Sequence, residues 1–246
     1  MSAVVVVTGA GRGLGQAIVM DLAARGARLV LAGRSEKHLR RTEADVVASG
    51  GTALVVATDV ADGASVERLF ARTVDAFGRV DVLVNNAGVT HEARLADLDD
   101  ADWDRVVDTN LRGLFLCSRQ AARAFAAAGS GRAVNIASVW GLLGRPGFSA
   151  YCASKGAVVN FTRSVAAEWA RFGAQMNCVA PGYFATDINA DFRADAEAVT
   201  KVLRRVPARR MGEPYELANL VTYLALDAPA YLTGQTIAID GGESSV

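Results

Sequence analysis

The chain has few of the residues that mark secreted, metal-binding or membrane-spanning proteins. Its 246 residues include three cysteines, two histidines and five prolines, and no Cys-x-x-Cys pair occurs. Sparse, unpatterned cysteines are typical of reduced thiols in a cytosol, and two histidines cannot build a histidine-rich metal site. No apolar run approaches the roughly 20 residues that a membrane-spanning helix needs. The start of the chain lacks the basic segment of a signal peptide, so we expect a cytoplasmic protein. From the few histidines and cysteines we expect no metal site.

The chain also carries no excess of charge of either sign. Its 26 Lys and Arg balance 26 Asp and Glu, and 51% of its residues are hydrophobic. A balanced charge gives no electrostatic footprint for nucleic acid or an anionic membrane, and so apolar a chain is not disordered. We therefore expect one globular domain over residues 1–246, because single α/β domains often reach this length.

Short apolar runs alternate with helix-length amphipathic segments along the whole chain. Most of these runs are continuously apolar, which is typical of strands buried on both faces of a parallel sheet. The alternation predicts an α/β fold of the Rossmann type, a doubly wound parallel seven-stranded sheet with helices on both faces. Strands are expected at Val4–Thr8, Arg28–Ala32, Ala53–Thr58, Val80–Asn85, Ala133–Ala137, Gln175–Ala180 and Thr236–Ile239, and helices at about 14–25, 36–49, 62–77, 101–127, 149–172 and 214–227.

One long irregular stretch, residues 183–212, interrupts this alternation just after a strand end. Long insertions at the carboxyl edge of a parallel sheet often serve as substrate lids, and a surface helix is the alternative. The cations of this stretch form either a solvated helix face or a surface that meets an anionic substrate or carrier. They are Lys201, Arg204, Arg205, Arg209 and Arg210.

A glycine-rich loop follows the first strand directly and leads into a helical pattern. From Thr8 onward it reads TGAGRGLG, a TGxxxGxG spacing rather than plain GxGxxG. Glycines let the backbone turn tightly and approach a pyrophosphate, and the helix N-terminus then offers free N–H groups. We expect this loop to bind a dinucleotide rather than only to make a tight turn. Its expected binding residues are Gly9, Arg12, Gly13, Leu14 and Gly15.

The end of the second strand indicates which dinucleotide binds. An acidic side chain there would hydrogen-bond the ribose 2′-hydroxyl of NAD, but the chain has Gly33-Arg34-Ser35 instead. Together with the loop arginine Arg12, this segment suits a 2′-phosphate, which guanidinium groups bind bidentately. The expected cofactor is therefore NADP(H). If both arginines are merely solvated, this preference has no basis.

Tyr151 and Lys155 lie four residues apart and share one face of a predicted helix. A phenol with a pKa near 10 is a poor acid–base catalyst at neutral pH, but a neighbouring ammonium favours the phenolate. By itself this pair is a weak signal, because the same spacing occurs by chance in many helices. Its context decides the interpretation.

That context resembles the short-chain dehydrogenase/reductase family over the whole chain. The segment Thr8–Gly15 is similar to the cofactor loop of the family, and Asn85–Gly88 is similar to its Asn-Asn-Ala-Gly motif. Four further residues match the catalytic tetrad of the family in order and spacing. They are Asn110, Ser138, Tyr151 and Lys155.

The resemblance implies a role for each member of the tetrad. Tyr151 donates a proton to a ketone oxygen as hydride arrives from the nicotinamide, and Ser138 hydrogen-bonds that oxygen. Lys155 lowers the pKa of the tyrosine and holds the nicotinamide ribose, while Asn110 positions a water that links Lys155 to solvent. Besides Tyr151 and Lys155, the implied cofactor contacts are Asp59, Val60, Asn86, Ala87, Gly88, Pro181, Gly182, Phe184 and Thr186.

The substrate pocket is expected to form from the segment after Ser138, the segment after Gly88, and the lid. Their side chains are mainly aromatic and apolar with a few polar groups, which suits a ketone on a moderately hydrophobic molecule. The candidates are Trp140, Leu142, Leu143, Arg145, Phe148, Thr90, His91, Glu92, Tyr183, Phe184, Ile188 and Phe192.

The first of two substrate classes within the family is a 3-oxoacyl thioester. The short N-terminus and the closing Asp240–Gly242 are similar to 3-oxoacyl-[acyl-carrier-protein] reductases, which hold an acidic carrier protein with basic residues. The matching positions here are Gly129 and Phe172. Arg132 and Arg171 lie close by in the sequence, so carrier binding is weakened rather than excluded.

The second class comes from Pro181–Thr186 and the lid, which are similar to gluconate 5-dehydrogenase-like members that act on polyols and keto sugar acids. A third alternative, a non-catalytic NADP(H)-sensing protein, usually has a decayed tetrad, and all four members stand here. The expected partners are a small carbonyl or alcohol substrate and, for the first class, an acyl-carrier protein. Family members usually form homotetramers through the two long helices, where apolar surface comes from Leu111, Leu114, Phe115 and Phe161.

Overall fold

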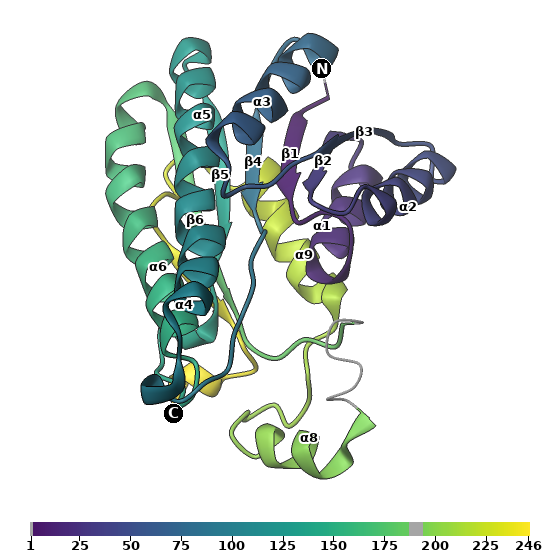
Figure 1. The fold of residues 1–246 in the computed structure, drawn as a ribbon. Coiled ribbons are helices and arrows are strands. Elements are labelled where there is room, and N and C mark those ends of the chain that lie inside the picture. Colours follow the sequence, from purple (N-terminus) through teal and green to yellow (C-terminus); the bar gives the residue numbers. More distant parts are fainter. Residues whose placement is uncertain (1, 187–193) are drawn as a thin grey trace.

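The computed structural model describes residues 2–186 and 194–246. Its seven strands form one sheet in the order β3-β2-β1-β4-β5-β6-β7, and every neighbouring pair is parallel (Figure 1). This confirms the predicted fold class. The strands are β1 Val4–Thr8, β2 Arg28–Gly33, β3 Thr52–Ala57, β4 Val82–Asn85, β5 Gly131–Ile136, β6 Ala174–Pro181 and β7 Thr236–Ile239.

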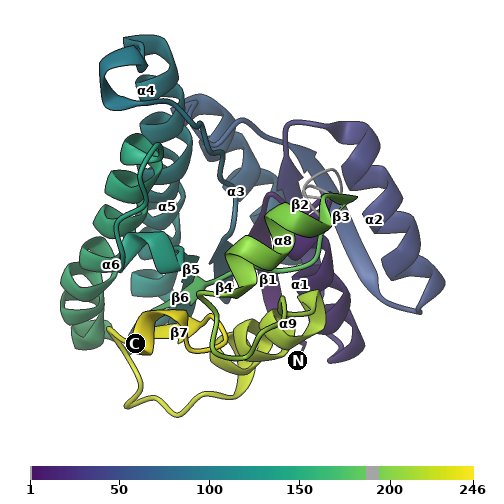
Figure 2. The same ribbon diagram turned by 90° about the horizontal axis from the view of Figure 1, so that it is seen from below.

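Helices cover both faces of the sheet (Figures 1 and 2). Apolar side chains of α1, α2 and α9 pack with one face of the sheet, and those of α3, α5 and α6 pack with the other. Each strand interior is therefore buried on both sides, which explains the continuous apolar runs. The helices are α1 Gly13–Ala24, α2 Glu36–Ala48, α3 Gly63–Phe77, α4 Asp100–Val107, α5 Gly113–Ala128, α6 Ser149–Trp169, α8 Ala196–Leu203 and α9 Pro214–Thr222.

Two predicted helices differ from the observed ones in the same way. The segment expected as one helix over 101–127 consists of α4 and α5, joined by a π-helical turn at Asp108–Arg112. The segment expected over 214–227 is α9 followed by a second π-helical turn, Tyr223–Asp227. Both π turns lie within otherwise continuous helical stretches, and no residue type in the sequence marks where such a turn occurs.

The core beneath α5 and α6 contains an aromatic pair. Trp169 is 2% exposed, and its ring meets that of Phe125 edge to face with 5.5 Å between the centroids. A side chain on Gly131 would place its Cβ 2.1 Å from the Phe125 ring. Trp169 thus belongs to the core and not to an outer surface.

The order of the strands reverses direction between β1 and β4. The chain runs outward from β1 through β2 to β3, and then returns to the other side of β1 to build β4 through β7. In doubly wound sheets, ligands bind at the carboxyl ends of the strands beside such a switch point. No helix within the described residues is long and apolar enough to cross a membrane.

Candidate active site

The carboxyl ends of four strands carry the motifs that the sequence singled out. The glycine loop follows β1, Asn86–Gly88 follow β4, Ser138 follows β5, and Gly182 follows β6. Register pairs each of these ends with its neighbour, for example Asn85 with Asn135 and Ile136 with Val179. Segments far apart in the sequence therefore meet along one edge of the sheet.

The glycine loop is held closely against the start of α1. A Cβ on Gly15 would lie 2.1 Å from the Gly9 oxygen, so only glycine permits this approach. Arg12 precedes α1 and makes no side-chain cap, and the first turn contains no acidic residue. By contrast, side chains cap α2, α3, α4 and α8. The uncapped N–H groups of α1 fit a pyrophosphate.

Thr8 and Asn86 join the glycine loop to the end of β4. The Thr8 hydroxyl accepts the backbone N–H groups of Asn86 and Ala87, both at 3.0 Å. The side-chain amide of Asn86 donates to the backbone carbonyl oxygens of Thr8 and Gly9 at 3.0 and 3.2 Å. The side chain of Asn86 therefore holds the glycine loop in place. The predicted cofactor contact would then come from the backbone of Asn86, Ala87 and Gly88.

Arg12 and Arg34 are both exposed at this edge of the sheet, and neither forms an ion pair within the described ranges 2–186 and 194–246. Ser35, between Arg34 and α2, caps that helix. Two unpaired guanidinium groups beside the β2 end fit a 2′-phosphate better than a ribose hydroxyl. Further along, Asp59 accepts the Ala61 N–H at 3.0 Å, and Val60 is buried under α5.

Ser138 and Tyr151 come together from the end of β5 and the first turn of α6. Ser138 is 8% exposed, and its hydroxyl accepts the N–H of Trp140 at 3.1 Å. Burial raises the pKa of Tyr151, and a hydrogen bond with Ser138 lowers it. The predicted lowering of this pKa by Lys155 does not appear among these effects and stays a prediction for the complex with NADP⁺.

Lys155 lies one turn after Tyr151 and is 4% exposed. Its Nζ donates to the Ile136 oxygen at 2.7 Å and lies 5.8 Å from the centroid of the Tyr151 ring. Burial lowers the pKa of Lys155 to about 8. A Cβ on Gly88 would lie 3.4 Å from the same Nζ, so the segment after β4 reaches the tetrad.

Asn110 lies in the π-helical turn between α4 and α5 and is fully buried. Its Oδ1 accepts the Val89 N–H at 2.8 Å, and its Nδ2 donates to the Val89 oxygen at 2.9 Å and to the Ser154 hydroxyl at 3.1 Å. Ser154 donates in turn to the backbone carbonyl oxygen of Tyr151 at 2.8 Å. Asn110 thus connects the segment after β4 to α6.

Sequence reasoning missed this part played by Ser154. The residue follows Tyr151 by three positions, a spacing that places it on the same face of α6. Its contact with Asn110 depends on how α6 crosses the π turn, which the sequence does not reveal.

An aromatic wall adjoins the tetrad. The Trp140 ring lies 4.7 Å from that of Phe148, 6.0 Å from that of Tyr151 and 5.9 Å from that of Tyr183, between centroids. The Arg145 guanidinium stacks 5.4 Å from the Trp140 centroid. Four of the expected substrate residues, Trp140 and three that contact its ring, are therefore gathered near Tyr151.

The other expected substrate residues lie less directly against this wall. Leu142 is 41% exposed. His91 lies 3.3 Å from the Asp102 carboxylate, which also pairs with Arg105, so its ring is tied to α4. Phe184, predicted to contact the cofactor, is 6% exposed and packs on Gly212. Ile188 and Phe192 lie outside the described residues.

The basic residues of the segment 183–212 have different surroundings. Arg210 pairs with Glu216 through two hydrogen bonds of 2.7 and 2.8 Å, and Arg209 donates to the Arg204 oxygen at 2.6 Å. Lys201, Arg204 and Arg205 are exposed, with no ion pair in the described part of the chain. Figure 1 shows α8, which carries Lys201, standing apart from the sheet.

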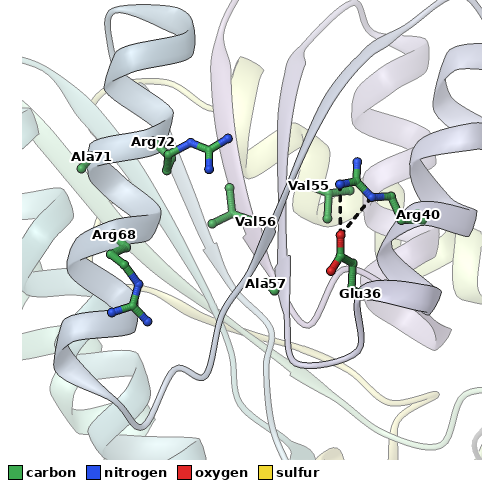
Figure 3. A pocket seen from close by; sticks show the side chains of 8 residues that line it. All are labelled: Glu36, Arg40, Val55, Val56, Ala57, Arg68, Ala71 and Arg72. Atoms are coloured by element: carbon green, nitrogen blue, oxygen red, sulfur yellow. Dashed lines mark hydrogen bonds and ion pairs between the residues drawn. The ribbon is translucent and has the colours of Figure 1, made fainter.

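A separate hollow of about 430 Å³ lies along β3 between α2 and α3 (Figure 3). Val55 and Val56 line it, with Arg68 and Arg72 of α3 on one side and an ion pair of α2 on the other. None of the tetrad lines this hollow.

Comparison with known proteins agrees with this geometry. A family model described as enoyl-(acyl carrier protein) reductase matches residues 9–244. A 3-oxoacyl-[acyl-carrier-protein] reductase of Synechocystis sp. is 42% identical over 241 residues, which cover 97% of this chain and 96% of the relative.

Two solved structures are similar over nearly their whole length. A variant of an actinorhodin polyketide ketoreductase, solved with NADPH, has a TM-score of 0.95 at 37% identity and covers 100% of this chain and 98% of its own. A gluconate 5-dehydrogenase of Burkholderia cenocepacia, solved with NADP and tartrate, has a TM-score of 0.94 at 36% identity. The match covers 100% of this chain and 97% of the dehydrogenase. Both hold the cofactor that the sequence predicts. With full-length relatives of this kind and a matching family model, the chain belongs to the short-chain dehydrogenase/reductase family of oxidoreductases.

Proposed function

We propose that the protein is an NADP(H)-dependent oxidoreductase that interconverts a ketone and a secondary alcohol, with Tyr151 as the proton donor. The observation that carries this proposal is the convergence of Ser138, Tyr151 and Lys155 at the carboxyl edge of the sheet, beside an uncapped helix N-terminus. The NADP(H) held by both solved relatives supports the choice of cofactor.

NADPH, when bound, supplies a hydride to the carbonyl carbon. Burial keeps the proton on the Tyr151 oxygen at neutral pH, as a donor in a reduction requires. Ser138 accepts a hydrogen bond from Trp140 and also hydrogen-bonds Tyr151. When a ketone binds, the hydroxyl hydrogen of Ser138 turns from Tyr151 to the substrate oxygen. The Lys155 cation and Ser138 stabilise the phenolate that remains after proton transfer.

The segment 183–212 acts in this proposal as a lid over the substrate. Its base is fixed by reciprocal backbone hydrogen bonds, Gly212 N–H to the Tyr183 oxygen at 2.9 Å and Ala185 N–H to the Gly212 oxygen at 3.0 Å. An anchored base beside the aromatic wall suits a segment that closes over a bound ketone.

A 3-oxoacyl thioester or polyketide-type ketone is the first substrate class. The names of the Synechocystis relative and the polyketide ketoreductase support it. Carrier docking at Arg132 and Arg171 meets a geometric obstacle, because Arg132 begins β5 and Arg171 follows the end of α6. At 1.5 Å per residue, Arg171 lies roughly 30 Å from Tyr151. A carrier bound there would have to present its substrate across this distance.

A keto sugar acid is the second substrate class. It is favoured by the similarity to a gluconate 5-dehydrogenase that holds tartrate, itself a polyhydroxy acid. The unpaired cations Lys201, Arg204 and Arg205 suit an acid of this kind.

The proposal is tested by following NADPH oxidation with an acetoacetyl thioester, 5-ketogluconate, a cyclic diketone and an aromatic polyketide-like ketone. We expect turnover of at least one ketone and a loss of about 10³-fold in kcat for Tyr151→Phe. Turnover of the thioester assigns the first class, and turnover of the sugar acid alone assigns the second. NADPH binding without turnover of any ketone would contradict the proposal and point to an NADP(H)-sensing protein.

The preference for NADP(H) has its own test. We expect NADPH to bind about 100-fold more tightly than NADH, and Arg34→Ala to reduce this ratio about tenfold, because it removes a partner of the 2′-phosphate. Arg72→Ala, an exposed arginine of α3, is the matched control. Equal dissociation constants of the wild-type protein for NADPH and NADH would exclude the preference.

A further inference from the structure

Two buried polar groups near the aromatic wall have hydrogen-bonding capacity that no described residue satisfies. Glu243 begins the C-terminal turn Glu243–Ser245 and is 8% exposed, and its Oε2 is buried with no partner among the described residues. The hydroxyl of Tyr183 is likewise buried, with no acceptor for its hydrogen in the described part of the chain. Buried polar atoms are nearly always hydrogen-bonded, so two such groups together call for an explanation.

The immediate neighbours of Glu243 do not supply one. The Asp240 carboxylate already accepts the N–H groups of Gly242 at 2.9 Å and Ser244 at 2.8 Å, and it repels a second carboxylate. Burial and Asp240 raise the pKa of Glu243, whereas Arg145 and Arg205 lower it. Both arginines lie near enough to affect the group electrostatically, but neither forms an ion pair with it.

Glu243 and Tyr183 share one neighbourhood. Burial raises the pKa of Tyr183 most, and the Glu243 carboxylate raises it further. The same two arginines and a hydrogen bond with Trp140 lower it. A hollow of about 60 Å³ adjoins Tyr183 and is bordered by Asp240 and Gly241, just before the turn that carries Glu243. A volume above roughly 15 Å³ admits one water-sized group, so this hollow has room for a hydroxyl.

The indole of Trp140 connects this neighbourhood with Tyr151. The Trp140 ring lies 5.9 Å from that of Tyr183 and 6.0 Å from that of Tyr151, so the two tyrosines flank the same indole. A ketone whose oxygen meets Tyr151 therefore extends along Trp140 toward Tyr183.

We propose that Glu243 and Tyr183 form a subsite that binds a hydroxyl group of the substrate, remote from the reacting carbonyl. The hydroxyl donates to the Glu243 carboxylate and accepts from the Tyr183 O–H, which satisfies both groups at once. An unsubstituted acyl chain in this place leaves the carboxylate unpaired and buried, which is costly. The preferred substrates are thus hydroxylated ketones, such as keto sugars or hydroxylated polyketides.

This inference rests on the proposed function, and its test separates the two. Initial rates with NADPH are measured for cyclohexanone and for 3- and 4-hydroxycyclohexanone. We expect the wild-type protein to favour at least one hydroxylated ring about tenfold or more in kcat/KM, as one satisfied buried hydrogen bond implies. Glu243→Met and Tyr183→Phe should each reduce this ratio to about one.

Three comparisons make the result decisive. Glu243→Gln keeps the shape and an acceptor oxygen, so it should retain part of the preference, and Glu168→Met, an exposed position at the far end of α6, should retain all of it. Thermal melting confirms that each variant is folded. Reduction of all three ketones without any preference, or equal losses on all of them in Glu243→Met, overturns the subsite alone. Turnover of the acetoacetyl thioester without turnover of any of these rings also overturns the subsite alone. Failure on these rings and on every ketone of the panel above overturns the proposed function, and the subsite with it.

Discussion

Lys155 is a buried cation in a place where burial opposes its charge. Its pKa is lowered to about 8, while its Nζ donates to Ile136 and faces the ring of Tyr151. A charge held at this cost beside a phenol is typical of a functional site. The residue therefore has opposite effects on activity and on stability as the pH changes.

For activity, we expect kcat/KM for NADPH to fall as the pH rises above about 8, because Lys155 then loses the proton that makes it a cation. The measurement is a pH profile of ketone reduction at low NADPH concentration. Lys155→Met, with its loss of kcat, should show no such step in its residual rate. A profile that stays flat from pH 7 to pH 10 would refute the role of this charge.

For stability, the sign is reversed. Between pH 8 and the ordinary pKa of 10.5, the unfolded chain holds more protons at Lys155 than the folded one, so the free energy of unfolding rises with pH over this window. The rise amounts to about 3 kcal/mol at most. Denaturant unfolding of the wild-type protein and of Lys155→Met at pH 7 and pH 10 isolates this contribution, since other groups cancel in the difference. An equal pH dependence of both proteins would contradict it.

Single residues also show how far the sequence could predict the site. Tyr151, Lys155, Ser138 and Asn110 were identified through the resemblance to a family, and the structure places them together. The partner of Asn110, Ser154, was not identified, because its contact arises from the crossing of two elements. Glu243 stands three residues before Val246, in a segment where nothing in the sequence indicates burial.

At the scale of elements, all seven strands could be predicted within about two residues, because strands buried on both faces give continuous apolar runs. The π turns at Asp108–Arg112 and Tyr223–Asp227 could not be predicted, since no residue type marks such a turn within a long helical stretch. The first of these turns carries Asn110, so a π turn that could not be predicted positions a residue of the candidate site.

The junction of α5 and β5 provides a test of packing at this scale. A Cβ at position 131 would lie 2.1 Å from the ring of Phe125, which is fully buried against Trp169. We expect Gly131→Ala to lower the free energy of unfolding by about 2–3 kcal/mol, because the core has no room for the methyl group. Gly144→Ala, where a Cβ meets open space, is the control. The free energy of unfolding of each variant is measured by chemical denaturation. Equal values for the two variants would show that Phe125 moves aside at little cost.

At the scale of the whole molecule, the outer faces of α4 and α5 remain partly apolar. Phe115 is 42% exposed and Trp103 is 37% exposed, whereas Leu114, predicted beside Phe115 as assembly surface, is buried. The Arg119 guanidinium covers one part of the Phe115 ring at 5.1 Å. A residual apolar face of this kind suits association between copies of the chain.

We predict that the protein is a homotetramer and that Phe115→Glu produces smaller species, because a buried charge at an interface is costly. Light scattering after size exclusion measures the mass of each. Val47→Glu, a similarly exposed apolar residue on α2, should leave the assembly unchanged. A wild-type monomer at micromolar concentration would contradict the prediction.

The central claim is that hydride passes from the cofactor to a carbonyl carbon while Tyr151 supplies the proton. It is tested most directly with NADPH deuterated at the transferring position of the nicotinamide, supplied with the ketone that shows the highest turnover. The account predicts one deuterium on the alcohol carbon of the product for the wild-type protein, and a rate about 10³-fold lower for Tyr151→Phe. Product without deuterium, or an undiminished rate in Tyr151→Phe, would contradict it.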